Sequence, residues 1–217
     1  MKKLGKLGYN FKLIAMLTGS ALNTYASGLY LGLDSGYGAI NTSTANGYRF
    51  TKNTTAQSSG NILAGLIAGF DFNNYIGLEL AYNYIASSQY SIGENSSSNF
   101  NVNQQIYDLG VTGHFPLGLL GKSLNHFSLF GKAGIGYSNT SFSGGYAINQ
   151  PSSNIVAFPG SSTNYVPVFA AGLEYDIGKI GIQAGYKYAG SNTISNGSQN
   201  IATTSNNLYT ISLLYHF

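Results

Sequence analysis

The chain ends on the stretch Tyr209-Thr210-Ile211-Ser212-Leu213-Leu214-Tyr215-His216-Phe217. Every second residue from Tyr209 onward is aliphatic or aromatic, whereas the residues between them are polar except Leu214. Successive side chains of a β-strand point to opposite faces of the sheet. The stretch therefore predicts a strand with one wholly apolar face and one mainly polar face.

Seven earlier segments of the chain alternate in the same manner. Each has the ~9–11 residues that a strand needs to cross a membrane. Charged residues inside the segments fall on the polar face, as Glu79 and Lys132 illustrate. The seven segments span residues 29–37, 62–72, 76–84, 107–115, 127–137, 169–177 and 180–188. With the C-terminal stretch they predict eight strands that each turn one face to lipid.

Composition separates a membrane barrel from other classes of protein. Only 8% of the 217 residues are charged, whereas a soluble globular domain has about 25%. No stretch approaches the ~18 consecutive apolar residues of a transmembrane helix, which excludes a helical membrane protein. A soluble β-sandwich would also have alternating strands, but not this low charge or aromatic strand ends. We therefore predict an all-β fold, an eight-stranded antiparallel up-and-down transmembrane β-barrel.

The connections between the segments alternate in length. Short connections are expected at residues 73–74 and 178–179, and a moderate one at 116–126. Long connections rich in Ser, Thr, Asn and Gly are expected near residues 40–60, 86–102, 138–164 and 189–206. Outer-membrane barrels have short periplasmic turns and long extracellular loops, so the short connections are assigned to the periplasmic side.

The first residues have the features of a secretory signal peptide. Residues 1–12 are basic, residues 13–22 form a short apolar core, and Thr24 and Ala26 are small residues before a cleavage site. Ten residues span only ~15 Å as a helix, against ~30 Å of hydrocarbon, which disfavours a membrane anchor. We expect residues 1–26 to be a cleaved signal peptide and residues 27–217 to be the barrel domain. Cleavage after Ala21 is the alternative.

Removal of this segment changes the charge balance. Four of the ten basic residues lie in residues 1–12, which leaves six basic and seven acidic residues in the remaining chain. No basic patch remains that would bind nucleic acid. The chain has no Cys, which excludes a structural disulfide, a thiol nucleophile and a lipid-anchored N-terminus.

Three stretches of the sequence resemble a known family. Residues 69–74 (Gly-Phe-Asp-Phe-Asn-Asn) and 75–82 (Tyr-Ile-Gly-Leu-Glu-Leu-Ala-Tyr) resemble the second and third strands of the OmpA-type transmembrane barrel. Residues 166–175 (Val-Pro-Val-Phe-Ala-Ala-Gly-Leu-Glu-Tyr) resemble its sixth strand. The resemblance implies a Gram-negative outer membrane, and the end of the chain at Phe217 implies no separate peptidoglycan-binding domain. Tyr215 and Phe217 look like the C-terminal signal that the outer-membrane assembly machinery reads.

The resemblance also bears on the barrel interior. It implies that Glu79 and Glu174 match inward carboxylates that pair with basic residues in the lumen, and that Lys132 falls where the family has a basic residue. Gln183 and Thr112 stand where the family has a lumenal Arg and a lumenal Lys. With the alternation pattern, the expected lumenal polar network consists of Asp34, Glu79, Asp108, Lys132, Glu174 and Lys187.

Two functions are compatible with such a network. An eight-stranded barrel has an interior just wide enough for side chains to fill, which favours a packed polar plug. The alternative is a narrow pore or small-solute transport barrel, which would prefer cations because the carboxylates outnumber the lysines.

The sequence does not indicate an enzyme, and we expect no catalytic, cofactor-binding or metal-binding residues. A lipid hydrolase would need a His near a Ser at the outer leaflet. His114, His126 and His216 instead map to the periplasmic end. No group of His, Asp and Glu has metal-ligand spacing along the chain.

The sequence thus predicts a porin-like outer-membrane protein and surface antigen, with a role in envelope integrity and in adhesion through its long loops. The expected partners are outer-membrane lipid and lipopolysaccharide, the assembly machinery, and a host or surface ligand bound by the loops. Residues 144–167 mix apolar residues such as Tyr146 and Phe158 with Ser and Asn. These residues either pack onto the barrel rim or form a surface-binding patch.

Overall fold

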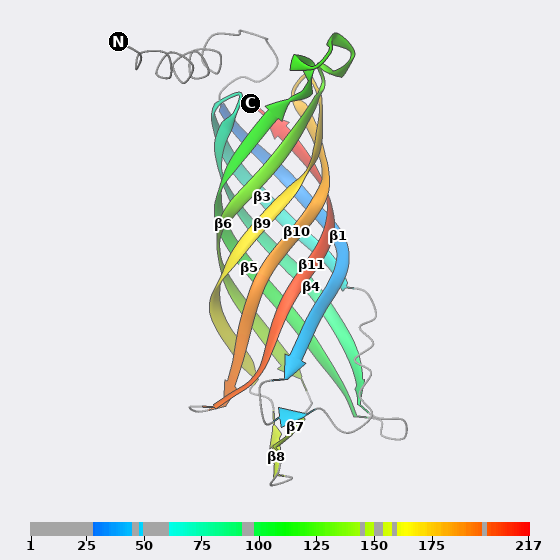
Figure 1. The fold of residues 1–217 in the computed structure, drawn as a ribbon, viewed down its shortest axis with the longest axis vertical. Coiled ribbons are helices and arrows are strands. Elements are labelled where there is room, and N and C mark those ends of the chain that lie inside the picture. Colours follow the sequence, from blue (N-terminus) through cyan, green and yellow to red (C-terminus); the bar gives the residue numbers. More distant parts are fainter. Residues whose placement is uncertain are drawn as a thin grey trace, which may run out of the picture.

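The computed structural model is a closed barrel of eight long antiparallel strands (Figure 1). It describes residues 28–44, 48–49, 61–92, 98–143, 146–149, 154–157, 160–196 and 199–217. The barrel strands are β1 (Gly28–Thr44), β3 (Asn61–Asn73), β4 (Ile76–Ile92), β5 (Ser98–Pro116), β6 (Phe127–Ser143), β9 (Ser161–Ile177), β10 (Ile180–Asn196) and β11 (Gln199–His216). Each strand pairs with its neighbour along the chain, and β1 pairs with β11 to close the sheet. The predicted eight-stranded antiparallel barrel is confirmed, whereas the expected signal peptide lies outside the described residues.

Side chains alternate between a buried inner face and an exposed outer face, as the sequence pattern predicts. In β3, Ile62 and Leu66 are exposed, whereas Leu63 and Ile67 are buried. The charged side chains that the structure describes in the barrel strands are all buried in the interior. They are Asp34, Asp71, Glu79, Asp108, Lys132, Glu174, Asp176 and Lys187. The outer wall is therefore uncharged along the described strands, as contact with lipid requires.

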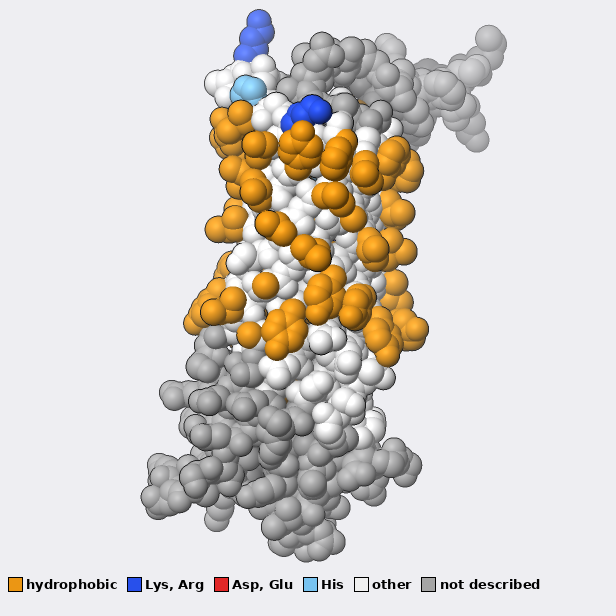
Figure 2. All heavy atoms as spheres, turned by 180° about the vertical axis from the view of Figure 1, so that it is seen from behind, with side chains coloured by type: hydrophobic (Ala, Val, Ile, Leu, Met, Phe, Trp, Pro, Cys, Tyr) orange, Lys and Arg blue, Asp and Glu red, His pale blue; other side chains and the backbone are white. Residues whose placement is uncertain are grey.

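Figure 2 shows a band of apolar side chains across one face of the barrel. Aromatic rings are exposed on the outer wall at both ends of this band. On the side of the long connections, Tyr82 and Tyr107 have ring centroids 4.9 Å apart, and those of Tyr137 and Tyr165 are 5.5 Å apart. The side of the short turns has a second set of rings, which includes the pairs Phe70–Phe72, Phe127–Tyr175 and Tyr215–Phe217. Such paired girdles mark the two interfaces of a membrane.

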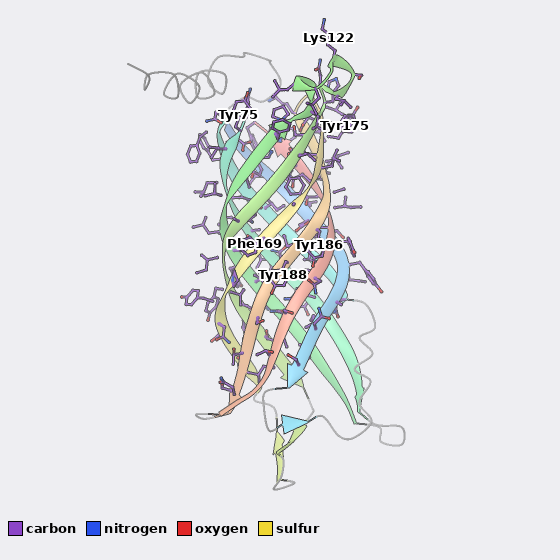
Figure 3. All side chains as sticks on the ribbon, in the orientation of Figure 1. Tyr75, Lys122, Phe169, Tyr175, Tyr186 and Tyr188 are labelled. Carbon is purple, nitrogen blue, oxygen red and sulfur yellow. The ribbon has the colours of Figure 1, made fainter. Side chains whose placement is uncertain are left out.

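The short connections lie together at one end of the barrel. Asn73 ends β3 and accepts hydrogen bonds through Oδ1 from the backbone N–H groups of Tyr75 (2.8 Å) and Ile76 (3.1 Å), which fixes the turn into β4. Gly178, with φ of 62°, makes the equally short turn between β9 and β10. Two 3₁₀ turns, η1 (Leu117–Leu119) and η2 (Lys122–Leu124), connect β5 to β6. Figure 3 shows Lys122 at the tip of this end, beyond Tyr75 and Tyr175.

The structure corrects the expected lengths of the long connections. Much of residues 86–102, 138–164 and 189–206 belongs to strands, since β4 reaches Ile92 and β5 begins at Ser98, and β1 extends to Thr44 in the first connection. Tyr165, which belongs to the stretch 144–167 considered above as a surface patch, lies in β9. Beyond the apolar band water faces the outer wall, so outward positions become polar while the backbone ladder continues. One outward pair there is Ser43 and Thr203, whose hydroxyl oxygens are 2.7 Å apart.

Two of the long connections also pair with each other. A three-stranded sheet consists of β2 (Tyr48–Arg49), β7 (Tyr146–Asn149) and β8 (Asn154–Ala157). Tyr48 pairs with Asn149, so the connection after β1 is held against the connection after β6. Phe158, another apolar residue of that connection, lies outside the described residues. Among the described residues, no helix has the length and apolar character needed to cross a membrane.

The terminal Phe217 and Phe72 form a matched pair for testing the expected assembly signal. Both rings belong to the girdle at the short-turn end, and they are 58% and 57% exposed. Phe217→Ser and Phe72→Ser therefore remove similar apolar area from the lipid interface. We expect Phe217→Ser to lower the amount of protein in the outer membrane several-fold more than Phe72→Ser, because only Phe217 belongs to the C-terminal strand signal. Quantitative immunoblots of outer-membrane fractions measure this, and equal amounts of the two variants would contradict the assignment.

A buried polar network as the candidate functional site

Lys132 lies at the centre of the barrel interior between two carboxylates from neighbouring strands. Its Nζ atom, which projects from β6, donates to Glu79 Oε1 of β4 at 2.7 Å and to Asp108 Oδ1 of β5. The three side chains are buried. A buried charge is stable only when it is paired and its remaining hydrogen-bonding atoms are satisfied, so the two carboxylates fix the position of this ammonium group.

Lys187 forms the second ion pair of the interior. Its Nζ atom donates to Asp34 Oδ2 at 2.7 Å and to Asn83 Oδ1 at 3.1 Å. The Asn83 side chain in turn donates to Asp108 Oδ2 at 3.0 Å. Asn83 thus joins the two lysines and their three carboxylates into one network that crosses the lumen.

Neutral hydroxyl groups supply further donors to this network. The Tyr30 hydroxyl donates to Glu79 Oε2 at 3.0 Å, and the Ser212 hydroxyl donates to Asp34 Oδ1 at 2.9 Å. Three carboxylates face two ammonium groups, so the ion pairs alone leave one negative charge. Hydrogen bonds to ionised carboxylates are among the stronger ones in proteins, and they stabilise this excess charge.

Glu174 lies apart from the two lysines. Its Oε2 atom lies 3.0 Å from His114 Nδ1 and accepts a hydrogen bond from Gln183 Nε2 at 3.3 Å. The salt bridges found for Lys132 and Lys187 in the described part of the chain go to Glu79, Asp108 and Asp34. The structure therefore brings five of the six expected network residues together and places the sixth in a separate cluster near the short turns.

That second cluster contains residues that the sequence prediction left out. Asp71 Oδ1 lies 3.9 Å from His114 Nε2, and Asp71 Oδ2 lies 3.9 Å from His216 Nδ1. Asp176 is buried two residues after Glu174 on the same face of β9. The alternation pattern already put Asp71 and Asp176 on the inner face, so it was the signal that could have identified them. The same pattern put Tyr30 and Asn83, which join the central network, on the inner face.

The half of the interior nearer the long connections has no charged side chain among its described residues. An apolar cluster that includes Leu63, Ile85 and Leu208 fills it. Between these residues, Gln104 donates to the Ser138 hydroxyl at 2.6 Å and accepts from Asn206 at 2.7 Å. This half of the lumen thus contains aliphatic side chains, together with side-chain amides that are hydrogen-bonded within it.

Little space remains around the charged network. A cavity of about 20 Å³ lies there, lined by residues that include Asp34, Glu79, Lys132 and Lys187. Such a volume holds about one water molecule. The charged groups therefore bind one another. Their geometry suits a network that links strands across the lumen better than it suits a binding pocket.

Replacement of Lys132 by Ala tests how much this charged network contributes to the free energy of unfolding. The change leaves Glu79 and Asp108 buried without their cation, which costs on the order of 3–5 kcal/mol. Leu80→Ala is the control, because Leu80 lies on β4 beside Glu79 but is 56% exposed on the outer wall. We expect the urea midpoint of the refolded barrel to fall more for Lys132→Ala than for Leu80→Ala. Equal midpoints would show that the network does not stabilise the barrel.

Comparison with known proteins identifies the family of the chain. The family described as the OmpA-like transmembrane domain matches residues 24–217. Among solved structures, Neisserial surface protein A is similar with a TM-score of 0.50 at 14% identity, over 89% of this chain and 100% of that one. The outer membrane protein OprG from Pseudomonas aeruginosa is similar with a TM-score of 0.53 at 15% identity, over 89% and 97% of the two chains. The comparison with curated proteins found no match. The chain belongs to the family of OmpA-like transmembrane domains and is a β-barrel of the outer membrane.

Proposed function

We propose that this protein is a non-enzymatic structural barrel of the outer membrane, with a closed lumen and an outer end exposed at the cell surface. The observation that carries the proposal is the small space left at the charged network, a cavity of about 20 Å³. A water-filled channel needs a continuous open path, and a water-sized cavity at this level of the lumen does not provide it. In this proposal the protein contributes to envelope integrity through a stable barrel that crosses the membrane without a permanent pore.

Two successive layers support closure of the lumen. The first is the network of Lys132 and Lys187, which takes its carboxylates from β1, β4 and β5. The second is the apolar and amide cluster that includes Leu63 and Gln104. An ion that crosses the barrel would have to break the ion pairs of the first layer and then lose its hydration in the second, where no charged group is described.

A narrow, cation-preferring pore is the second candidate. The excess of carboxylates favours it, because Asp34, Glu79 and Asp108 face only Lys132 and Lys187 in the central network. Lys132 also contacts two carboxylates at once, so a shift toward either one would change the shape of the lumen. This candidate requires a second arrangement of the network with a wider path.

The surface role rests on the outer ends of the strands. These ends continue past the apolar band with exposed, uncharged polar side chains such as Asn41 and Ser43. The small sheet of β2, β7 and β8 joins two of the connections at that end. A rigid barrel that holds loops at one end is a common way to display a binding surface. We include adhesion to a host or surface ligand in the proposal on this basis.

Conductance in planar lipid bilayers separates the two candidates. The closed barrel predicts no steady channel for the wild-type protein and more frequent brief openings in Lys132→Ala, because loss of the ammonium group loosens the first layer while the second remains. Leu80→Ala is the matched control and is expected to remain closed. A steady cation-selective conductance of the wild-type protein, unchanged in Lys132→Ala, would contradict the closed barrel and favour the pore.

A further inference from the structure

Three potential metal-binding side chains converge at the periplasmic end of the lumen. Glu174 and Asp176 project from the same face of β9, and His216 comes from the end of β11. One donor atom from each of these residues lies within 4.8 Å of a donor atom from each of the other two. The strand between them is β10, so residues from alternate strands meet across it.

The convergence depends on Gly181 of β10. A Cβ atom at this position would lie 3.1 Å from Asp176 Oδ1, 3.3 Å from Glu174 Oε1 and 3.3 Å from His216 Nε2. The absent side chain therefore leaves a space that the three donor atoms border directly. Gly181 is itself buried, so the space lies inside the wall and not on the outer surface.

The carboxylate oxygens at this space lack hydrogen-bond partners. Both side-chain oxygens of Asp176 and the Oε1 atom of Glu174 are buried and accept no hydrogen bond from the described residues. Asp176 is 4% exposed and Glu174 is fully buried. Buried polar atoms are nearly always paired with protein, water or an ion. Two of these oxygens, Asp176 Oδ1 and Glu174 Oε1, lie beside Gly181, and together they indicate that a further group binds there.

Neighbouring residues orient the donors toward this space. His114 and Gln183 contact Oε2 of Glu174, which leaves Oε1 beside Gly181. Asp71 Oδ2 lies 3.9 Å from His216 Nδ1, while His216 Nε2 is the atom near Gly181. A carboxylate behind the second nitrogen of a ligating His is the usual support of a metal site.

The charge of the cluster also favours a cation. Asp71, Glu174 and Asp176 carry three negative charges when ionised, against the two imidazoles of His114 and His216. The lysine salt bridges in the described strands all go to the central network. A divalent ion would compensate the excess negative charge. It would also coordinate the carboxylate oxygens of Glu174 and Asp176 that accept no hydrogen bond.

We propose that Glu174, Asp176 and His216 bind a divalent transition-metal ion of the Zn²⁺ class at the periplasmic mouth of the barrel. One imidazole and two carboxylates suit Zn²⁺ and its neighbours, whereas Ca²⁺ and Mg²⁺ prefer ligand sets made only of oxygen. At Zn–ligand bonds of ~2.0–2.2 Å the donors lie ~3.4 Å apart, so the side chains close by about 1 Å on binding. Water completes the coordination from the mouth, where the His216 side chain is 15% exposed.

Calorimetric titration of the full barrel with ZnCl₂ tests this site. The protein is purified from outer membranes without a polyhistidine tag, and native folding of each variant is checked by circular dichroism. We expect one Zn²⁺ per barrel and at least a ~10-fold loss of affinity in Asp176→Asn and in Gly181→Ala. Gly181→Ala keeps every ligand and only fills the space between them. MgCl₂ is expected to give no comparable heat.

The matched control is Gly131→Ala in β6, the strand that pairs with β9 on the side away from β10. A Cβ atom there would meet only the Ala170 backbone oxygen, at 3.9 Å, and Zn²⁺ affinity is expected to stay unchanged. Binding that is equally strong in all variants would place the ion elsewhere, for example at the exposed His126, and would overturn the proposal. Absence of binding, with a higher urea midpoint in Asp176→Asn, would overturn it in favour of a proton shared by the two carboxylates.

Discussion

The pairing of β1 with β11 is the hydrogen-bonded contact on which the rest of the structure depends. The ladder runs from Tyr30 opposite His216 to Thr44 opposite Ala202, and it leaves the eight-stranded sheet without an edge. In lipid an unpaired backbone N–H or C=O costs several kcal/mol, so an open sheet of these strands would not be stable in a membrane. Closure also fixes which side chains face inward, because the strand period is two.

Closure with only eight strands in turn determines the interior. The lumen is narrow enough for side chains to fill, yet the inner face carries eight charged residues of the described strands. Their desolvation is offset by contact with one another and with neutral donors, and the strands place Lys132 and Lys187 against three carboxylates. Near the short turns the compensation is less complete, because the two carboxylate oxygens of Asp176 accept no hydrogen bond from the described chain. The central network of Lys132 and Lys187 therefore stabilises the barrel, whereas the periplasmic cluster that contains Asp176 can still bind a ligand.

The barrel and its inward charges could be predicted because alternation is a local signal that each strand carries by itself. The depth of each charge in the lumen could not, since it depends on the stagger between strands. For this reason Glu174 was expected beside a lysine and instead contacts His114. The approach of His216 to Glu174 joins residues far apart in the sequence. The outer strand ends were missed for another reason: outside the lipid the outward residues are polar, so the apolar outer stripe stops where the hydrogen-bond ladder continues.

The central claim is that the charged side chains inside the barrel bind one another and thereby hold the lumen closed. A double-mutant cycle of Lys132→Met and Glu79→Gln, with the free energy of unfolding measured in lipid vesicles, tests it most directly. Groups in direct contact in a buried network have coupling energies of about 0.5–3 kcal/mol. We expect a value in the upper half of this range, with the double variant more stable than the sum of the single effects implies. Additive effects, within about 0.5 kcal/mol, would mean that the two charges are solvated separately in an open lumen and would contradict the account.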